Sequence, residues 1–83
     1  MKLKVAIWWR GEGTPFVESI FKGKNLTDIG SKVEQFLDTI VQERRKFISA
    51  VDLLDGEEHF IGRWRVVKSE NYGLIWVFSF SGR

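Results

Sequence analysis

Only one stretch of this chain, residues 25–47, carries apolar residues at helical spacing, and segments patterned as β-strands lie on both sides of it. The apolar side chains recur at i, i+4, i+7, i+8 and i+11, which is the spacing of one helical face: Ile29, Val33, Phe36, Leu37 and Ile40. The run Glu43–Lys46 then places three cations in the last turn, where they suit the negative end of the helix dipole. With a single helix, most of the fold must be built from strands.

The start of this helix has two candidates. Thr27 as the N-cap places Asp28 in the first turn, where the helix dipole favours an acidic group. Ser31 as the N-cap forms a capping box with Glu34. We prefer Thr27, because the apolar stripe already includes Ile29.

The first strand, Lys2–Trp9, alternates between an apolar face and a wetter face. The apolar face carries Leu3, Val5, Ile7 and Trp9, and the other carries Lys2, Lys4, Ala6 and Trp8. Because consecutive side chains of a strand point to opposite faces, only one of the two adjacent tryptophans can enter the core, and we assign Trp9 to it. The glycines and proline of residues 10–15 form a turn, and residues 16–22 return as the second strand.

Three more strands follow the helix, separated by turns rich in Asp, Gly and Asn. We expect them at residues 47–54, 60–68 and 74–80. The order ββαβββ predicts one compact α+β domain over residues 1–83, with a mostly antiparallel sheet of about five strands and the helix packed on one face. The expected core residues are Leu3, Val5, Ile7, Ile29, Val33, Phe36, Leu37, Ile40, Val51, Trp76 and Phe78.

One helix is too narrow to cover such a sheet. A helix is about 10 Å wide, whereas five strands at a spacing of about 4.8 Å span about 24 Å. The last strand is apolar on both faces, and such a strand is normally buried on both. One face carries Leu74, Trp76, Phe78 and Phe80, and the other carries Ile75 and Val77. We therefore consider three covers: a curled sheet, a second copy of the chain, or a bound ligand.

The composition excludes several classes of protein. The 83 residues include no cysteine and a single histidine, so the chain offers no disulfide, no thiolate metal site and no histidine pair for a metal. The N-terminal apolar run, Val5–Trp9, is too short for the core of a signal peptide or for a membrane span. We expect a cytoplasmic protein with no membrane association, no metal and no cofactor. The net charge of +2 by itself favours no polyanionic partner.

Cations and one tryptophan gather on the wetter faces of two expected strands, the first and the fourth. If these faces lie on the same side of the sheet, that side is cationic with an aromatic ring set in it. Single-stranded DNA or RNA is bound by this chemistry, because cations follow the phosphates and a ring stacks on a base. The alternative is that Lys and Arg stems simply lie over tryptophan rings on a solvated face. The candidate nucleic-acid contacts are Lys2, Lys4, Trp8, Arg10, Arg63 and Arg65.

Nothing in the sequence indicates a catalytic site. His59 follows two glutamates at a turn, and such a pair can serve acid–base chemistry, but no second polar partner is apparent on another element. The serines stand in no nucleophile motif, and residues 10–13 lack the spacing of a phosphate-binding loop. We therefore expect a protein that is not an enzyme, with His59 as a solvated turn residue.

Two other functions remain open beside single-stranded nucleic-acid binding, which we prefer. We expect a homodimer, which is compatible with nucleic-acid binding and would cover apolar sheet surface with a second copy of the chain, since closed twofold dimers are the commonest homo-oligomers and tryptophan is enriched at interface hot spots. An adaptor would bind an unidentified protein partner by its sheet face or an edge strand. The candidate self-association residues are Trp8, Ile75, Trp76, Val77 and Phe78.

Overall fold

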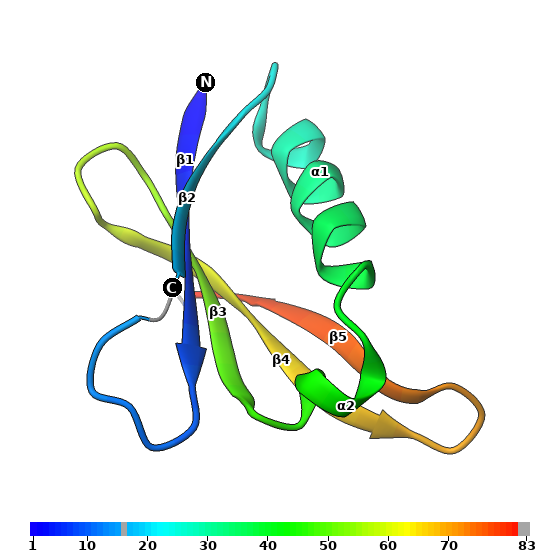
Figure 1. Cartoon of the computed structure of the whole chain (residues 1–83). Coiled ribbons are helices and arrows are strands. Elements are labelled where there is room, and N and C mark those ends of the chain that lie inside the picture. Colours follow the sequence, from blue (N-terminus) through cyan, green and yellow to red (C-terminus); the bar gives the residue numbers. More distant parts are fainter. Residues whose placement is uncertain (16, 82–83) are drawn as a thin grey trace.

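Five strands and two helices make up the computed structural model of the chain, which describes residues 1–15 and 17–81. In chain order they are β1 (Lys2–Trp9), β2 (Val17–Lys22), α1 (Leu26–Asp38), α2 (Gln42–Arg45), β3 (Ile48–Leu54), β4 (Phe60–Ser69) and β5 (Gly73–Phe80). The strands form one antiparallel sheet in the order β2-β1-β3-β4-β5, and α1 lies against one of its faces (Figure 1). The two-layer α+β fold expected from the sequence is confirmed. Phe16, the expected first residue of the second strand, lies outside the described residues.

The core forms where the apolar face of the sheet meets α1. The register sets Ile7 opposite Val51 and Val51 opposite Trp64, so the inward side chains of β1, β3 and β4 form continuous rows. The apolar stripe of α1 packs onto these rows. The buried side chains of this core are Leu3, Val5, Ile7, Ile29, Val33, Leu37, Ile48, Val51, Leu53 and Trp64.

The expected core is right at its centre and wrong at its margin. Phe36 is 38% exposed, because it lies beside Phe21 of β2 at the outer edge of the layer, with ring centroids 6.0 Å apart. Ile40, Trp76 and Phe78 are only partly buried against the core. Trp9 faces the core as expected but is also only partly buried. The prediction omitted Ile48, Leu53 and Trp64.

Helix α1 begins before either expected start. Asn25 is the N-cap, and its side-chain oxygen accepts a hydrogen bond from the Asp28 backbone N–H at 2.8 Å. The Asp28 carboxylate in turn accepts the backbone N–H of Lys24 at 2.9 Å, which fixes the chain that enters the helix. Thr27 and Ser31 lie inside α1. Both expected caps are wrong, because Asn25 supplies the same capping chemistry farther upstream.

The single long helix expected from the sequence is also wrong, since α1 ends at Asp38. The β-branched side chains of residues 39–41 lower the helix propensity at this point. The hydroxyl of Thr39 donates to the Phe36 carbonyl at 2.6 Å, and the chain resumes as the short α2. The cations of residues 43–46 therefore lie outside the last turn of α1.

Two side chains of α2 fasten it to β5, and we call them the α2–β5 clamp. Arg45 is only 9% exposed and donates hydrogen bonds to the carbonyls of Ile40 at 2.7 Å, Leu74 at 2.7 Å and Asp38 at 3.2 Å. The Gln42 amide donates to the Leu74 carbonyl at 3.0 Å and accepts the Leu74 N–H at 2.9 Å. The clamp thus ties the end of α1 and the start of β5 to one short helix.

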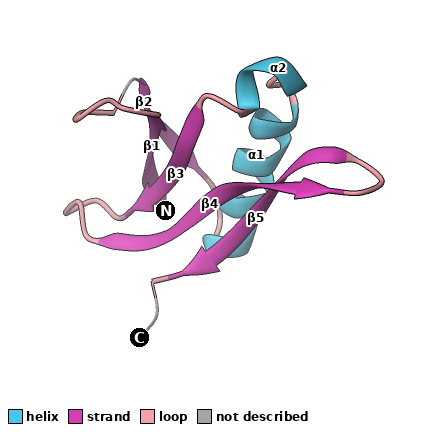
Figure 2. Cartoon of the chain, turned by 90° about the horizontal axis from the view of Figure 1, so that it is seen from below, coloured by secondary structure: helices cyan, strands magenta, loops and turns pink. Residues whose placement is uncertain are grey.

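The sheet curls around α1, so that a single helix contacts both edges of a sheet that is wider than the helix. Trp64 of β4 donates its indole N–H to the Glu34 carboxylate at 3.1 Å, and Trp76 of β5 donates to the Leu37 carbonyl at 3.1 Å. Phe21 brings β2 to the same helix from the other edge. Both edge strands therefore reach α1, and β4 and β5 run obliquely to β1 and β2 (Figures 1 and 2). In the described part of the chain, no helix covers the opposite face.

Candidate binding face

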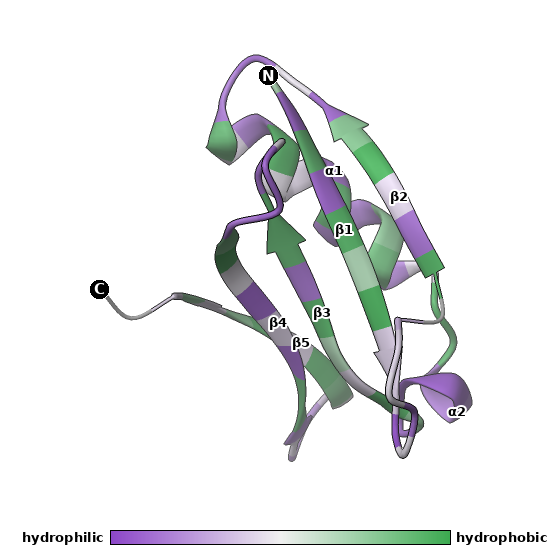
Figure 3. Ribbon diagram, turned by 90° about the vertical axis from the view of Figure 1, so that its left-hand side faces the viewer, coloured by the Kyte–Doolittle hydropathy of each residue, from purple (hydrophilic) through white to green (hydrophobic). Residues whose placement is uncertain are grey.

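The side of the sheet turned away from α1 is named the open face, and Figure 3 looks onto it with α1 behind the strands. Its residues follow from the register, which sets Ala6 opposite Asp52 and Asp52 opposite Arg63. The two predicted groups of cations therefore share one side of the sheet. The open face carries Lys2, Lys4, Ala6 and Trp8 of β1, Glu18, Ile20 and Lys22 of β2, Ala50, Asp52 and Leu54 of β3, Phe60, Arg63, Arg65 and Val67 of β4, and Ile75, Val77 and Ser79 of β5.

Lys4 is held by two carboxylates at the β2 side of the open face. Its ammonium lies 2.7 Å from Glu18 Oε1 and 3.3 Å from Glu58 Oε2. The hydrogen bonds to Glu18 and then to Glu58 raise the pKa of Lys4 above its ordinary value. Since these pairs neutralise its charge locally, Lys4 is poorly placed to bind a phosphate.

Arg63 is engaged in the same way at the centre of the open face. Its guanidinium makes a two-pronged contact with Asp52, with Nε 2.5 Å from Oδ1 and Nη2 3.1 Å from Oδ2. This hydrogen bonding raises the pKa of Arg63 above its already high ordinary value. Asp52 is only 6% exposed, so Arg63 compensates a buried negative charge. The guanidinium also lies 5.3 Å from the centroid of the Phe60 ring.

Trp8 lies on the open face and is half-buried, opposite Ala50 of β3. Its indole nitrogen is buried and has no hydrogen-bond partner among the residues that the structure describes. A buried N–H without a partner costs about 1–3 kcal/mol. The edge of the ring that carries the nitrogen is therefore turned inward, and the exposed part of the side chain comes from the rest of the ring.

Three cations near this end of β1 remain without a carboxylate partner in the described part of the chain. Arg65 is exposed on the open face. Arg10 follows β1 and donates its Nε to the Lys46 carbonyl at 2.7 Å, while its backbone N–H binds the Phe47 carbonyl at 2.8 Å. These two bonds bring the main chain of Lys46, which the sequence predicts at the end of the helix, next to Arg10. The Lys46 ammonium lies 5.2 Å from the centroid of the Phe47 ring. We call Trp8 with Arg10, Lys46 and Arg65 the Trp8 cluster.

The exposed turn around His59 is held by Asp55. The Asp55 carboxylate accepts the backbone N–H groups of Glu57 at 2.8 Å and His59 at 2.9 Å, and the bond from His59 is the main cause of its lowered pKa. The imidazole Nδ1 lies 3.3 Å from Asp55 Oδ2 and 3.7 Å from Glu57 Oε1. Across residues 1–15 and 17–81, no group of three or more His, Cys, Asp or Glu side chains is placed to hold a metal ion. These contacts support a structural role for the turn.

The structure divides the expected self-association residues between the two sides of the sheet. Ile75 and Val77 share the open face with Trp8, and Val77 is 41% exposed. Trp76 and Phe78 point to the helix side and pack against the core. Sequence reasoning missed other exposed apolar residues of the open face: Ile20, Phe60 and Val67, at 60%, 42% and 44% exposure. Strand alternation would have found Ile20 and Val67, whereas Phe60 reaches this face only through the register shift between β3 and β4.

The fold and the open face define a class rather than a named family: a small single α+β domain with one helical layer and one uncovered sheet face. No family model, no curated protein and no solved structure matches the chain. Among the described residues, neither helix is long and apolar enough to traverse a lipid bilayer.

Proposed function

We propose that this chain is a non-enzymatic protein that binds single-stranded DNA or RNA through the Trp8 cluster. The observation that carries the proposal is the register, which sets Trp8 and Arg65 on the same helix-free side of the sheet. Arg10 and Lys46 lie together just beyond β1. In this arrangement the cations hold phosphates, and the exposed part of the indole stacks on a base.

The proposal narrows the set of contacts that the sequence suggested. Lys4 and Arg63 are no longer counted among the phosphate contacts, because each already has a carboxylate partner. Lys2 stays as an outlying phosphate contact at the far end of β1. A bound strand would therefore be held mainly by the three cations of the Trp8 cluster.

The test is a titration of labelled oligo-dT and of a mixed-sequence RNA at several salt concentrations. For single strands, a plot of the logarithm of the binding constant against the logarithm of the salt concentration has a slope of about −0.7 for each phosphate that the protein neutralises. Three contacts therefore predict a slope of about −2. Arg65→Gln removes one of the three contacts, so the slope should change to about −1.4 and binding should weaken severalfold at low salt.

Lys68→Gln is the matched control, because Lys68 is also an exposed cation of β4 but pairs with Leu74 on the helix side of the sheet. This variant should weaken binding less than Arg65→Gln does. Absence of binding to both nucleic acids at low salt would refute the proposal, as would equal losses in the two variants.

Self-association through the open face is a second candidate, favoured by a separate observation. Ile20, Val67 and Val77 are large apolar residues exposed on that face. The central charges of Asp52 and Arg63 are already paired, so a second copy could cover them without burying an unpaired charge. Light scattering from micromolar to near-millimolar protein decides it: a monomer throughout this range rules it out.

A further inference from the structure

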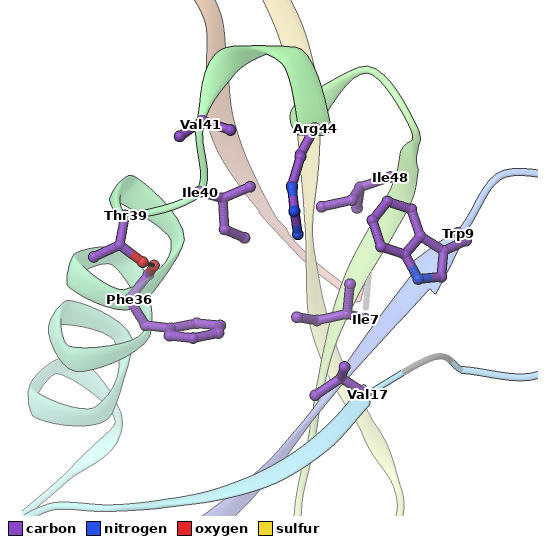
Figure 4. Close-up of a pocket in the computed structure, with 9 residues that line it drawn as sticks. All are labelled: Ile7, Trp9, Val17, Phe36, Thr39, Ile40, Val41, Arg44 and Ile48. Carbon is purple, nitrogen blue, oxygen red and sulfur yellow. Dashed lines mark hydrogen bonds between the residues drawn. The ribbon is translucent and has the colours of Figure 1, made fainter.

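A second, unrelated feature lies on the helix side of the molecule, where α1, α2 and the ends of β1 and β2 surround a hollow of about 440 Å³ (Figure 4). Its walls are apolar side chains from β1, β2, α1, the α1–α2 connection and β3: Ile7, Val17, Phe36, Ile40 and Ile48. The volume falls in the range of about 300–1,000 Å³ that small-molecule sites occupy. We call this feature the α1–α2 hollow.

The hollow exists because α1 stops early. Ile7 and Ile48 form a buried floor, at 6% and 3% exposure. Phe36 and Val41 rise from the floor and remain 38% and 55% exposed, since the chain turns away into α2. The apolar surface of this margin is therefore left in water by the fold itself.

Among the described residues that line the hollow, Arg44 is the only one with a charged side chain. Figure 4 shows it reaching from α2 between Ile40 and Ile48 toward the centre of the hollow. In the described part of the chain its guanidinium has no ion pair and no hydrogen bond, whereas the adjacent Arg45 is fully engaged in the α2–β5 clamp. An unpaired cation thus lies over an apolar cavity.

We propose that the α1–α2 hollow binds a small amphipathic carboxylate. Its hydrocarbon or aromatic body lies against the apolar walls, and its carboxylate pairs with Arg44. The charge complementarity argues for an anion, and the planar guanidinium matches the two oxygens of a carboxylate in a two-pronged contact. A neutral molecule of the same length gains the apolar contacts but leaves Arg44 unpaired.

Isotope labelling of isoleucine methyl groups gives a direct test, because isoleucines lie both inside and outside the hollow. Titration with decanoate below its micelle-forming concentration should shift the signals of Ile7, Ile40 and Ile48. Ile20 and Ile75, on the open face, should not move. Decanol should bind about tenfold more weakly than decanoate, because it lacks the charged contact, and acetate should not bind.

Arg44→Gln should weaken decanoate about tenfold and abolish its advantage over decanol. Arg65→Gln is the matched control, since it removes an exposed arginine from the opposite face and should leave decanoate binding unchanged. Shifts that are equal at Ile20 and Ile7, or a decanoate affinity unaltered by Arg44→Gln, would overturn the proposal. Nucleic-acid binding responds to the Arg65 variant instead, so the two proposals fail independently.

Discussion

Replacing Arg45 by alanine tests whether the α2–β5 clamp holds the helical layer to the far edge of the sheet. The guanidinium donates to carbonyls of Asp38, Ile40 and Leu74, which belong to the end of α1, its connection to α2, and the start of β5. Arginine suits this position because its five N–H donors are spread over three nitrogens of a planar, charged group, whereas the three donors of lysine share one nitrogen. The change to alanine removes all three bonds and leaves the carbonyls of Asp38 and Ile40 to find donors in water.

The expected cost follows from these three bonds. A hydrogen bond to a charged group contributes about 1.5–3 kcal/mol, but the guanidinium loses hydration when it is buried. The Leu74 carbonyl also keeps its bond from Gln42. With a net value near 1 kcal/mol per bond, Arg45→Ala should lower the free energy of unfolding by about 3 kcal/mol. That is a large share of the roughly 5–15 kcal/mol that stabilises a typical domain.

Urea unfolding followed by tryptophan fluorescence measures this loss. With a slope of about 1 kcal/mol per molar urea, the midpoint of Arg45→Ala should fall by about 3 M. Arg44→Ala is the matched control, since Arg44 is the exposed neighbour on the same short helix, and its midpoint should change by less than about 0.5 M. A loss below about 1 kcal/mol for Arg45→Ala, or equal losses in both variants, would refute the reasoning.

Two further changes probe the turns. Gly73→Ala should lower the free energy of unfolding, measured in urea, by about 2 kcal/mol, because Gly73 has φ +73° and an added Cβ would lie 2.8 Å from Gln42 Oε1. Gly56→Ala is the control and should change stability little, since an added Cβ there meets nothing within 4 Å. The pKa of Asp28 is lowered chiefly by the Lys24 backbone N–H, and that of Asp55 chiefly by the His59 backbone N–H. The stabilisation that each ionised carboxylate gives is therefore complete above the ordinary pKa of 3.8 and is lost as the pH falls through the lowered pKa. Because Asp55→Asn removes one of these carboxylates, its free energy of unfolding should fall less steeply on acidification than that of the unaltered protein. An unchanged dependence on acid would contradict this prediction.

The strands could be predicted from the sequence because alternation reports burial directly. The first strand was expected at Lys2–Trp9 and is found there, and the remaining strands differ by about a residue at their ends. The helix start was missed because three residues, Asn25, Thr27 and Ser31, offer capping chemistry within two turns. The helical end was missed because Arg45 binds the Leu74 carbonyl, which is distant in the chain, as well as the nearby carbonyls of Asp38 and Ile40.

The sequence predicts that cations and a tryptophan share a face of the sheet, but it does not predict which of these cations are paired with carboxylates. Sequence shows which residues share a face of one strand, and it does not show which strands are neighbours. Asp52 stands in an apolar run, and only the register opposite Arg63 reveals that this acid neutralises a predicted nucleic-acid contact. The same holds for Lys4 and Glu18, which come together across the first hairpin. The Trp8 cluster could therefore be separated from the paired cations only in three dimensions.

The way Gln42 binds Leu74 has a consequence for solubility. An edge strand exposes a row of unpaired main-chain groups on which strands of other molecules can assemble into aggregates. The Gln42 amide occupies both the N–H and the carbonyl of Leu74, as a neighbouring strand would, and Arg45 adds a second donor. The first part of the β5 edge is thus closed to intermolecular strand pairing by a side chain that imitates a peptide group.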